Sequence, residues 1–320
     1  MNLRYSMLEN FDQAARVGDL FRDVYADAYP MALYYHPEEL WEANQAGRLY
    51  SAVATDENDI VVGHCALYNT CPNPRVLEAG AGLVHVSARR EGAIARLFEV
   101  LQATAREKDL CDWLMVDAVC NHVATQKLAY RYGFVDTAVA VDHMPAAAYA
   151  REGYTQGRVS ALLSFLPLRD HGGTVNFPER YRAVLQNIYD KLGVERQALT
   201  SASPPAPTSR VTAWRNQQAS YLRVTVLEIG LDLQAHLEDD AEVFQLVLPL
   251  DSGALEFAVA EARKKGFFLA GVLPAWTSAD NIMLQRLKHP TNWESIVLQS
   301  DFAKALLESV KGDRRSQPVS

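Results

Sequence analysis

Two arginines and a glycine, placed between a strand pattern and a helical pattern, are the part of this chain best suited to chemistry. Residues 83–86 read as the end of a strand, and Arg89, Arg90 and Gly92 lead from it into an amphipathic helix. The first N–H groups of a helix have no partner within the helix, and the helix dipole places partial positive charge there. The sequence therefore predicts a site for an anion such as pyrophosphate at residues 89–94.

A second stretch joins an asparagine to a helix that ends in Gly-Phe. The nearly continuous apolar run at residues 113–119 is typical of a buried strand in a parallel pair, and Asn121 follows it. The helical pattern of residues 123–132 ends at Gly133, which suits the left-handed position after a helix. The strand, helix and strand over residues 80–119 predict a right-handed crossover.

In this order and spacing the two stretches resemble the acyl-CoA-binding core of the GNAT N-acetyltransferase superfamily. The first is similar to the pattern Arg/Gln-x-x-Gly-x-Gly/Ala over residues 89–94, with Ile94 in place of the last small residue. A register one residue later, starting at Arg90, also fits, but the first one starts the helix at Gly92. The second stretch is similar to Asn-x-x-Ala…Leu-Tyr-x-x-x-Gly-Phe, with one residue more than usual.

The resemblance implies direct transfer of an acyl group from acetyl-CoA, or another acyl-CoA, to a small-molecule amine, without a metal. Glu91 would place negative charge beside the pyrophosphate unless it points away. The arginine-glycine pattern has no counterpart in the C-terminal half, so we expect no second CoA site there. The cofactor-binding residues that the resemblance implies are Leu83, Val84, Val86, Arg89, Arg90, Glu91, Gly92, Ala93, Ile94 and Asn121.

The residues that would move protons during acyl transfer are candidates with stated alternatives. His85 is the candidate base for the incoming amine, and the alternative is a half-exposed histidine with a hydrogen-bonded ring. The family's tyrosine that protonates the leaving thiolate falls on Ala129 here, so Tyr130 serves only if the extra residue rotates the helix. Otherwise water is the acid, and Tyr130 covers the sheet edge. The resemblance also places Tyr34, Tyr35 and Trp41 in the wall of the acceptor site.

The periodicities predict an α/β (α+β) fold, a GNAT-type mixed twisted sheet flanked by helices, followed by a second smaller GNAT-like α/β domain. Residues 254–273 repeat the helix–Gly–Phe–strand order of residues 123–141, which indicates a degenerate internal repeat. The predicted domains are 1–168, 169–209 (a helical connector and proline-rich linker), 210–312 and a disordered tail, 313–320. Helices are expected at 12–25, 36–47, 92–108, 123–132, 178–192 and 254–265, and strands at 49–55, 60–68, 80–86, 113–119, 134–141, 158–167, 222–228, 243–248, 267–273, 282–287 and 295–299.

The composition and net charge limit the class of protein and the partners that it can bind. The hydrophobic and charged fractions, 49% and 22%, are those of an ordinary globular protein, and a formal charge of −8 argues against nucleic acid or an anionic membrane as partner. We expect a cytoplasmic protein without a signal peptide, with four free, buried cysteines; a homodimer stays open. Two other functions remain: an acyl-CoA sensor without catalysis, and a scaffold whose GNAT core no longer binds CoA.

Overall fold

The computed structural model describes residues 2–26, 29, 31–145, 157–199 and 201–317. The chain divides into two compact units, Met1–Asp117 and Ala118–Ser320. This division falls inside a strand and differs from the predicted boundaries at residues 168 and 210. The mixed α/β fold class that the periodicities predict is confirmed, because each unit contains parallel and antiparallel strands with helices packed on them.

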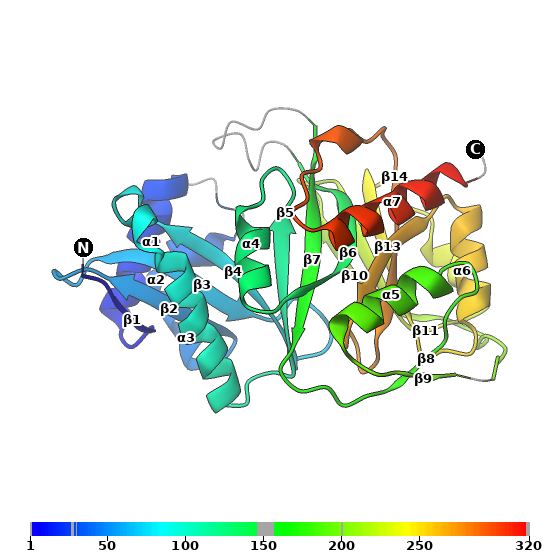
Figure 1. Ribbon diagram of the computed structural model, residues 1–320, viewed down its shortest axis with the longest axis horizontal. Helices are drawn as coiled ribbons and strands as arrows, with labels where there is room; N and C mark the ends of the chain where they lie inside the picture. The colour runs from blue at the N-terminus through cyan, green and yellow to red at the C-terminus, as the bar shows by residue number, and fades with distance from the viewer. Residues whose placement is uncertain (1, 27–28, 30, 146–156, 200, 318–320) are drawn as a thin grey trace. The chain divides into compact units, whose positions relative to one another are not determined.

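Unit 1 is built on five strands in the order β1-β2-β3-β4-β5 (Figure 1). The first four are antiparallel neighbours, whereas β4 and β5 are parallel, as the predicted crossover requires. The elements are β1 (Arg4–Met7), α1 (Phe11–Tyr25), the 3-10 helix η1 (Ala32–Tyr35), α2 (Pro37–Gln45), β2 (Leu49–Thr55), β3 (Val61–Tyr68), β4 (Val76–Val84), the 3-10 helix η2 (Val86–Glu91), α3 (Ala93–Glu107) and β5 (Trp113–Val119).

Helices cover both faces of the unit 1 strands. Neighbouring residues on a strand point to opposite faces. A Cβ on Gly63 in β3 would lie 3.2 Å from Leu97 of α3, whereas the ring of the next residue, His64, packs against Phe21 of α1. The helices α1 and α3 therefore lie on opposite faces, and β3 is buried along nearly its whole length.

Unit 2 holds the strand order β7-β6-β13-β14-β12-β11-β10, with α5 and α7 side by side over β6 and β13 (Figure 1). Within it β11 and β12 are parallel. Its elements are α4 (Ala124–Arg131), β6 (Val135–Met144), β7 (Val159–Pro167), β8 (Thr174–Val175), α5 (Arg182–Leu192), β9 (Gln197–Ala198), β10 (Arg210–Asn216), β11 (Tyr221–Glu228), η4 (Leu233–His236), β12 (Val243–Pro249), α6 (Leu255–Lys264), β13 (Phe268–Leu273), β14 (Asn281–Leu287), η5 (Trp293–Ser295) and α7 (Asp301–Arg315).

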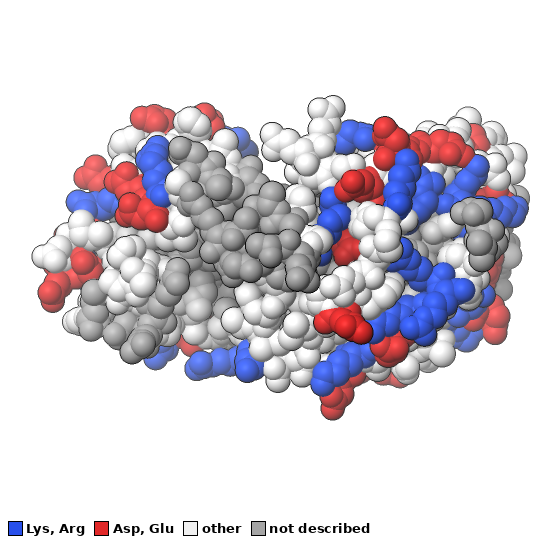
Figure 2. Space-filling model, turned by 90° about the horizontal axis from the view of Figure 1, so that it is seen from above, with Lys and Arg blue, Asp and Glu red and all other residues white. Residues whose placement is uncertain are grey.

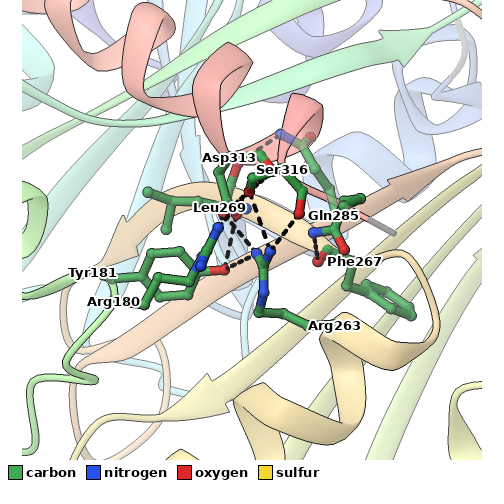
Figure 3. A network of polar contacts seen from close by, with 9 residues as sticks. Arg180, Tyr181, Arg263, Phe267, Leu269, Gln285, Asp313 and Ser316 are labelled. Atoms are coloured by element: carbon green, nitrogen blue, oxygen red, sulfur yellow. Dashed lines mark hydrogen bonds and ion pairs between the residues drawn. The ribbon is translucent and has the colours of Figure 1, made fainter. Parts of the chain in front are cut away.

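A buried carboxylate fastens the end of α7 to the rest of unit 2 (Figure 3). Asp313 accepts hydrogen bonds from Arg180 Nε at 2.9 Å, from Arg263 at 2.5 Å and from the Tyr181 hydroxyl at 2.8 Å. It also accepts the backbone N–H of Leu269 in β13 at 2.8 Å. Residues 313–315 are therefore the last turn of a helix and not the start of a disordered tail, because arginines far away in the sequence hold them there; residues 318–320 lie outside the described part.

The predicted strand at 295–299 is wrong. The segment follows η5 without joining a ladder, because its backbone bonds elsewhere: the N–H of Val297 donates to the Cys120 carbonyl, and that of Gln299 to the Gln126 side chain. The sequence also missed β1 and β10. Both contain arginine and pair along one edge only, with β2 and β11, so their apolar content is low.

The two helix–Gly–Phe–strand segments close in the same way. The N–H of Phe134 donates to the Ala129 carbonyl at 3.1 Å, and that of Phe267 donates to the Ala262 carbonyl, also at 3.1 Å. Gly133 and Gly266 are both left-handed, at φ +84° and +80°. This is the six-residue closure that commonly ends a helix. The local repeat is thus present in the structure, while a tandem GNAT architecture stays a prediction.

Gly271, where β13 meets β6, gives the first testable prediction. Its φ is +146°, and an added Cβ would lie 2.1 Å from the Thr137 carbonyl oxygen and 2.5 Å from Ala138 Cα. Gly271→Ala should lower the free energy of unfolding by about 3 kcal/mol, because backbone atoms cannot yield as a side chain does. Gly312→Ala, in open space on α7, is the control and should raise it by up to about 1 kcal/mol. Urea titration measures both, and equal effects would contradict this packing.

Candidate functional site: an open length of strand β4

The parallel ladder between β4 and β5 is short. It joins Val76, Leu77 and Glu78 to Trp113, Leu114 and Met115. Strand β4 runs on for six residues past Glu78, to Val84, so this part lies beyond the ladder with β5. A strand edge beyond its ladder is where an extended ligand can add its own hydrogen bonds.

A β-bulge interrupts β4 in this part. Gly80 pairs with Ala66 and Leu83 pairs with His64, so two residues of β4, Ala81 and Gly82, face a single residue of β3. Ala81 is left-handed at φ +49°, a conformation that costs a non-glycine residue roughly 1–2 kcal/mol. A bulge bends its strand and re-aims the residues that follow.

Gly82 is the exposed residue of this open length. A Cβ there would lie 2.9 Å from Ile94 Cδ1, in the first turn of α3. The departure from the family pattern at Ile94 is therefore matched by a glycine beneath it.

The helix α3 begins at Ala93, one residue after the predicted start, with Gly92 as its N-cap. Gly92 is exposed and left-handed at φ +67°, and an added Cβ would meet nothing within 4 Å. Among the described side chains none caps this helix. The helix start on which the predicted anion site depends is thus at Ala93, while the anion site itself stays a prediction, and the side chains of Arg89, Arg90 and Glu91 lie outside what the structure describes.

His85 caps η2. Its Nδ1 accepts the N–H of Ser87 at 3.3 Å and lies 2.8 Å from the Ser87 hydroxyl. When Nδ1 accepts, the proton of a neutral ring sits on Nε2, which then donates and cannot take up a proton. This geometry is that of the hydrogen-bonded histidine kept above as the alternative to a base.

The other predicted cofactor residues of unit 1 differ in access. Leu83 is 5% exposed and Ala93 is 1% exposed, so their side chains belong to the core. Val84 and Ile94 are half-buried, whereas the side chain of Val86 is 68% exposed. A ligand along this segment would meet backbone and the side chain of Val86, and not the side chains of Leu83 or Ala93.

Asn121 and Tyr130, both in unit 2, behave differently. The Asn121 side-chain oxygen is buried without a hydrogen-bond partner among the described residues. The Tyr130 hydroxyl donates to Asp136 at 2.7 Å and lies 3.3 Å from the Ser300 hydroxyl. Burial raises the pKa of Tyr130 and that of Asp136. Tyr130 therefore joins α4 to β6 and α7, and Asn121 keeps an acceptor atom for a further contact.

Of the three residues assigned to the acceptor wall, the prediction for Tyr34 is wrong. It is 0% exposed and stacks on Phe21 at 4.3 Å between ring centroids, so it is core. Tyr35 and Trp41 are half-buried, and the Tyr35 hydroxyl accepts the N–H of Tyr29 at 2.8 Å. Sequence reasoning did not single out Tyr68, whose hydroxyl donates to Glu78 at 3.0 Å beside Gly80.

Two cavities occur among the described residues. One of about 420 Å³ lies between α5 and α7, and one of about 320 Å³ lies near the start of β4, between Tyr50, Asn69 and Leu110. No cluster of metal-ligating side chains occurs among the described residues. All four cysteines are free, and burial raises the pKa of Cys65 and of Cys111 to about 12; Cys71 is half-buried, unlike the predicted fully buried thiols.

Charges of both signs mix on the surface. On the face in Figure 2, Lys and Arg gather over unit 2, with Asp and Glu standing among them. Ion pairs three residues apart also occur along α7, between Lys304 and Asp301 and between Lys311 and Glu308. Across the described residues no helix is both long and apolar enough to span a bilayer.

No family model matches the chain, and no curated protein sequence does either. Solved structures do. An N-acetyltransferase from Staphylococcus aureus Mu50 is similar at 17% identity and a TM-score of 0.43, over 53% of this chain and 100% of that one. The ribosomal-protein-S18-alanine N-acetyltransferase of Escherichia coli shares 18% identity, with a TM-score of 0.41, over 53% and 97%. A Salmonella typhimurium protein solved with its cofactor acetyl-CoA shares 18%, with a TM-score of 0.43, over 53% and 96%.

The His85 ring yields a test that separates cap from base. His85→Ala should lower the free energy of unfolding by about 1 kcal/mol, whereas His85→Asn, which keeps an acceptor for the Ser87 N–H, should lose little. Thermal unfolding measures both. In any acyl-transfer assay the Asn variant should keep most of the turnover. A stable Asn variant whose turnover collapses would instead make His85 the base.

Proposed function

We propose that the chain binds an acyl-CoA, acetyl-CoA first of all, along β4 and at the first turn of α3, and transfers the acyl group to a small-molecule amine. The observation that carries this proposal is the length of β4 beyond its ladder with β5, with Gly82 exposed and the N-terminus of α3 nearby in sequence and uncapped by described side chains. An extended amide chain pairs with the first feature, and a pyrophosphate with the second.

Each part of the acyl-CoA, the acyl carrier, has a proposed partner in the chain. The first amides of α3, at Gly92, Ala93 and Ile94, would receive the pyrophosphate, and the resemblance adds Arg89 and Arg90 to them. The carrier's amide-bearing arm would pair with the open length of β4. The resemblance also assigns a cofactor contact to Asn121, whose side-chain oxygen has no hydrogen-bond partner among the described residues.

In direct transfer, the amine lone pair forms a bond to the thioester carbon, the C–S bond breaks, and the thiolate leaves with its electron pair. Negative charge builds on the carbonyl oxygen during this step, and a backbone N–H aimed at it is the most effective stabiliser. The proton of the amine passes to water in this proposal, because His85 Nδ1 already serves as a cap. Water also protonates the thiolate, since the Tyr130 hydroxyl donates to Asp136.

Binding without turnover is the second candidate. It is favoured by the same two observations, the engaged ring of His85 and the engaged hydroxyl of Tyr130, and by Ala129 in the family's tyrosine position. A thiol-release assay with polyamines, amino acids, aminoglycosides and peptide N-termini separates the two functions. Release with one of the small amines supports the enzyme, release with peptides alone changes the acceptor class, and binding without release supports the sensor.

Gly92 offers a charge test of the carrier site. Gly92→Asp should weaken acetyl-CoA binding by roughly tenfold, because it sets a carboxylate beside the proposed pyrophosphate site, while changing stability by only about 1 kcal/mol. Gly193→Asp is a matched control: Gly193 has nearly the same backbone, φ +68° against +67°, and equally open surroundings at the end of α5. Isothermal titration measures the affinity.

Three results of that titration are informative. Weaker binding by the Gly92 variant alone supports the proposed site. Equal affinity in both variants would move the pyrophosphate away from α3. Wild-type protein that fails to bind acetyl-CoA at millimolar ligand would remove both the transferase and the sensor.

A further inference from the structure

A buried histidine touches the bulge in β4. His64, in β3, is 0% exposed, and its Nδ1 lies 2.9 Å from the carbonyl oxygen of Ala81. A carbonyl oxygen only accepts, so Nδ1 carries the proton. Nε2 is then a bare lone pair, and it has no partner among the described residues. The ring therefore makes a single polar contact in this part of the chain, and that contact is with the bulge.

Aromatic rings fix the plane of this imidazole. Phe21 of α1 and Tyr34 of η1 meet it edge to face, at centroid distances of 5.5 and 5.3 Å. Burial lowers the pKa of His64 to about 4, so the ring stays neutral near pH 7 and keeps one proton. The aromatic contacts and the neutral state together leave Nδ1–H pointing at Ala81.

The bond falls where β4 is strained. Ala81 holds a left-handed φ of +49°, and it is one of the two bulge residues that face a single residue of β3. Such a conformation persists only where its surroundings hold it. A side chain that served packing alone would be apolar at this place, because a buried polar ring with one unpartnered nitrogen is costly. The hydrogen bond from Nδ1 to the Ala81 carbonyl is the contact that offsets the cost of burying this ring.

We propose that His64 is a positioning residue: its Nδ1–H holds the Ala81–Gly82 bulge, and through the bulge it sets the open length of β4 for the amide-bearing arm of an acyl-CoA. This inference rests on the proposed acyl-CoA function and assigns it a residue that does not touch the ligand. The residue whose backbone it places is Gly82, the exposed one.

Two substitutions separate the donor from the ring. The side-chain amide of His64→Asn can stand where Nδ1 stands and donate to Ala81, so its affinity for acetyl-CoA should stay within about threefold of wild type. His64→Leu fills similar space without a donor and should bind roughly tenfold more weakly, because a displaced backbone edge misaligns its ligand. Val17→Ala, on α1 in the core cluster that holds Phe21 and Tyr34, should lower stability and leave affinity unchanged.

A ligand-free measurement tests the bond itself. In ¹⁵N NMR of the unmodified chain, His64 should show a protonated Nδ1 and a bare Nε2. In His64→Leu the amides of residues 81–83 should exchange faster with solvent than in His64→Asn. Both readouts test the His64–Ala81 hydrogen bond without any ligand. If wild-type protein binds no acetyl-CoA, the proposed function fails, but the hydrogen bond has still been tested.

The proposal is overturned by any of three results: a ring protonated on Nε2, equal amide exchange in both variants, or a His64→Leu protein that binds acetyl-CoA as tightly as wild type. A loss of affinity in Val17→Ala equal to that in His64→Leu would also overturn it, because stability alone would then explain the effect. If His64→Leu does not fold, the ring tautomer of the unmodified chain still decides.

Discussion

Unit 1 depends on how one strand satisfies its backbone hydrogen bonds. Strand β4 is paired with β3 along one edge, whereas β5 pairs with only Val76, Leu77 and Glu78 on the other. Backbone N–H and C=O groups need partners wherever they are buried, and a strand edge beyond its ladder is where a ligand can add hydrogen bonds. The bulge at Ala81, the glycine at 82 and the start of α3 are all arranged around that length.

Periodicity was enough to predict much of the frame. Strands β2 and β5 were predicted at their observed bounds, because alternation in one and a continuous apolar run in the other are strong local patterns. The bulge had no such signal. The carbonyl of an alanine at φ +49° contacts a histidine 17 residues earlier in the chain, a contact that no local pattern contains. The 3-10 helix between β4 and α3 was also missed.

Side-chain roles were harder to predict than elements. The sequence pattern around a tyrosine in a helical region is the same whether the tyrosine lines a cleft or packs in the core. Stacking on Phe21 shows that Tyr34 packs in the core. Asp313 lies in a polar stretch that resembles a tail, yet distant arginines bury it. For the candidate site, the sequence predicted the segment of the chain, while the availability of individual atoms at His85, Asn121 and Tyr130 depended on the folded structure.

The two halves of the chain share a closure and differ at their parallel pairs. Both end a helix with Gly-Phe in the same geometry. In the C-terminal half, however, β11 and β12 pair over five consecutive positions, Tyr221 to Thr225 with Val243 to Val247, whereas β4 and β5 pair over three. A longer ladder leaves less strand edge beyond it; whether either half binds CoA stays a prediction.

Hydrogen–deuterium exchange with and without acetyl-CoA reports on the backbone amides of β4 and of the start of α3. We expect acetyl-CoA to protect the amides of residues 79–95 and to leave those of residues 221–228 and 243–249 unchanged. Protection confined to the C-terminal strands, or none at ligand concentrations that saturate binding, would contradict this expectation.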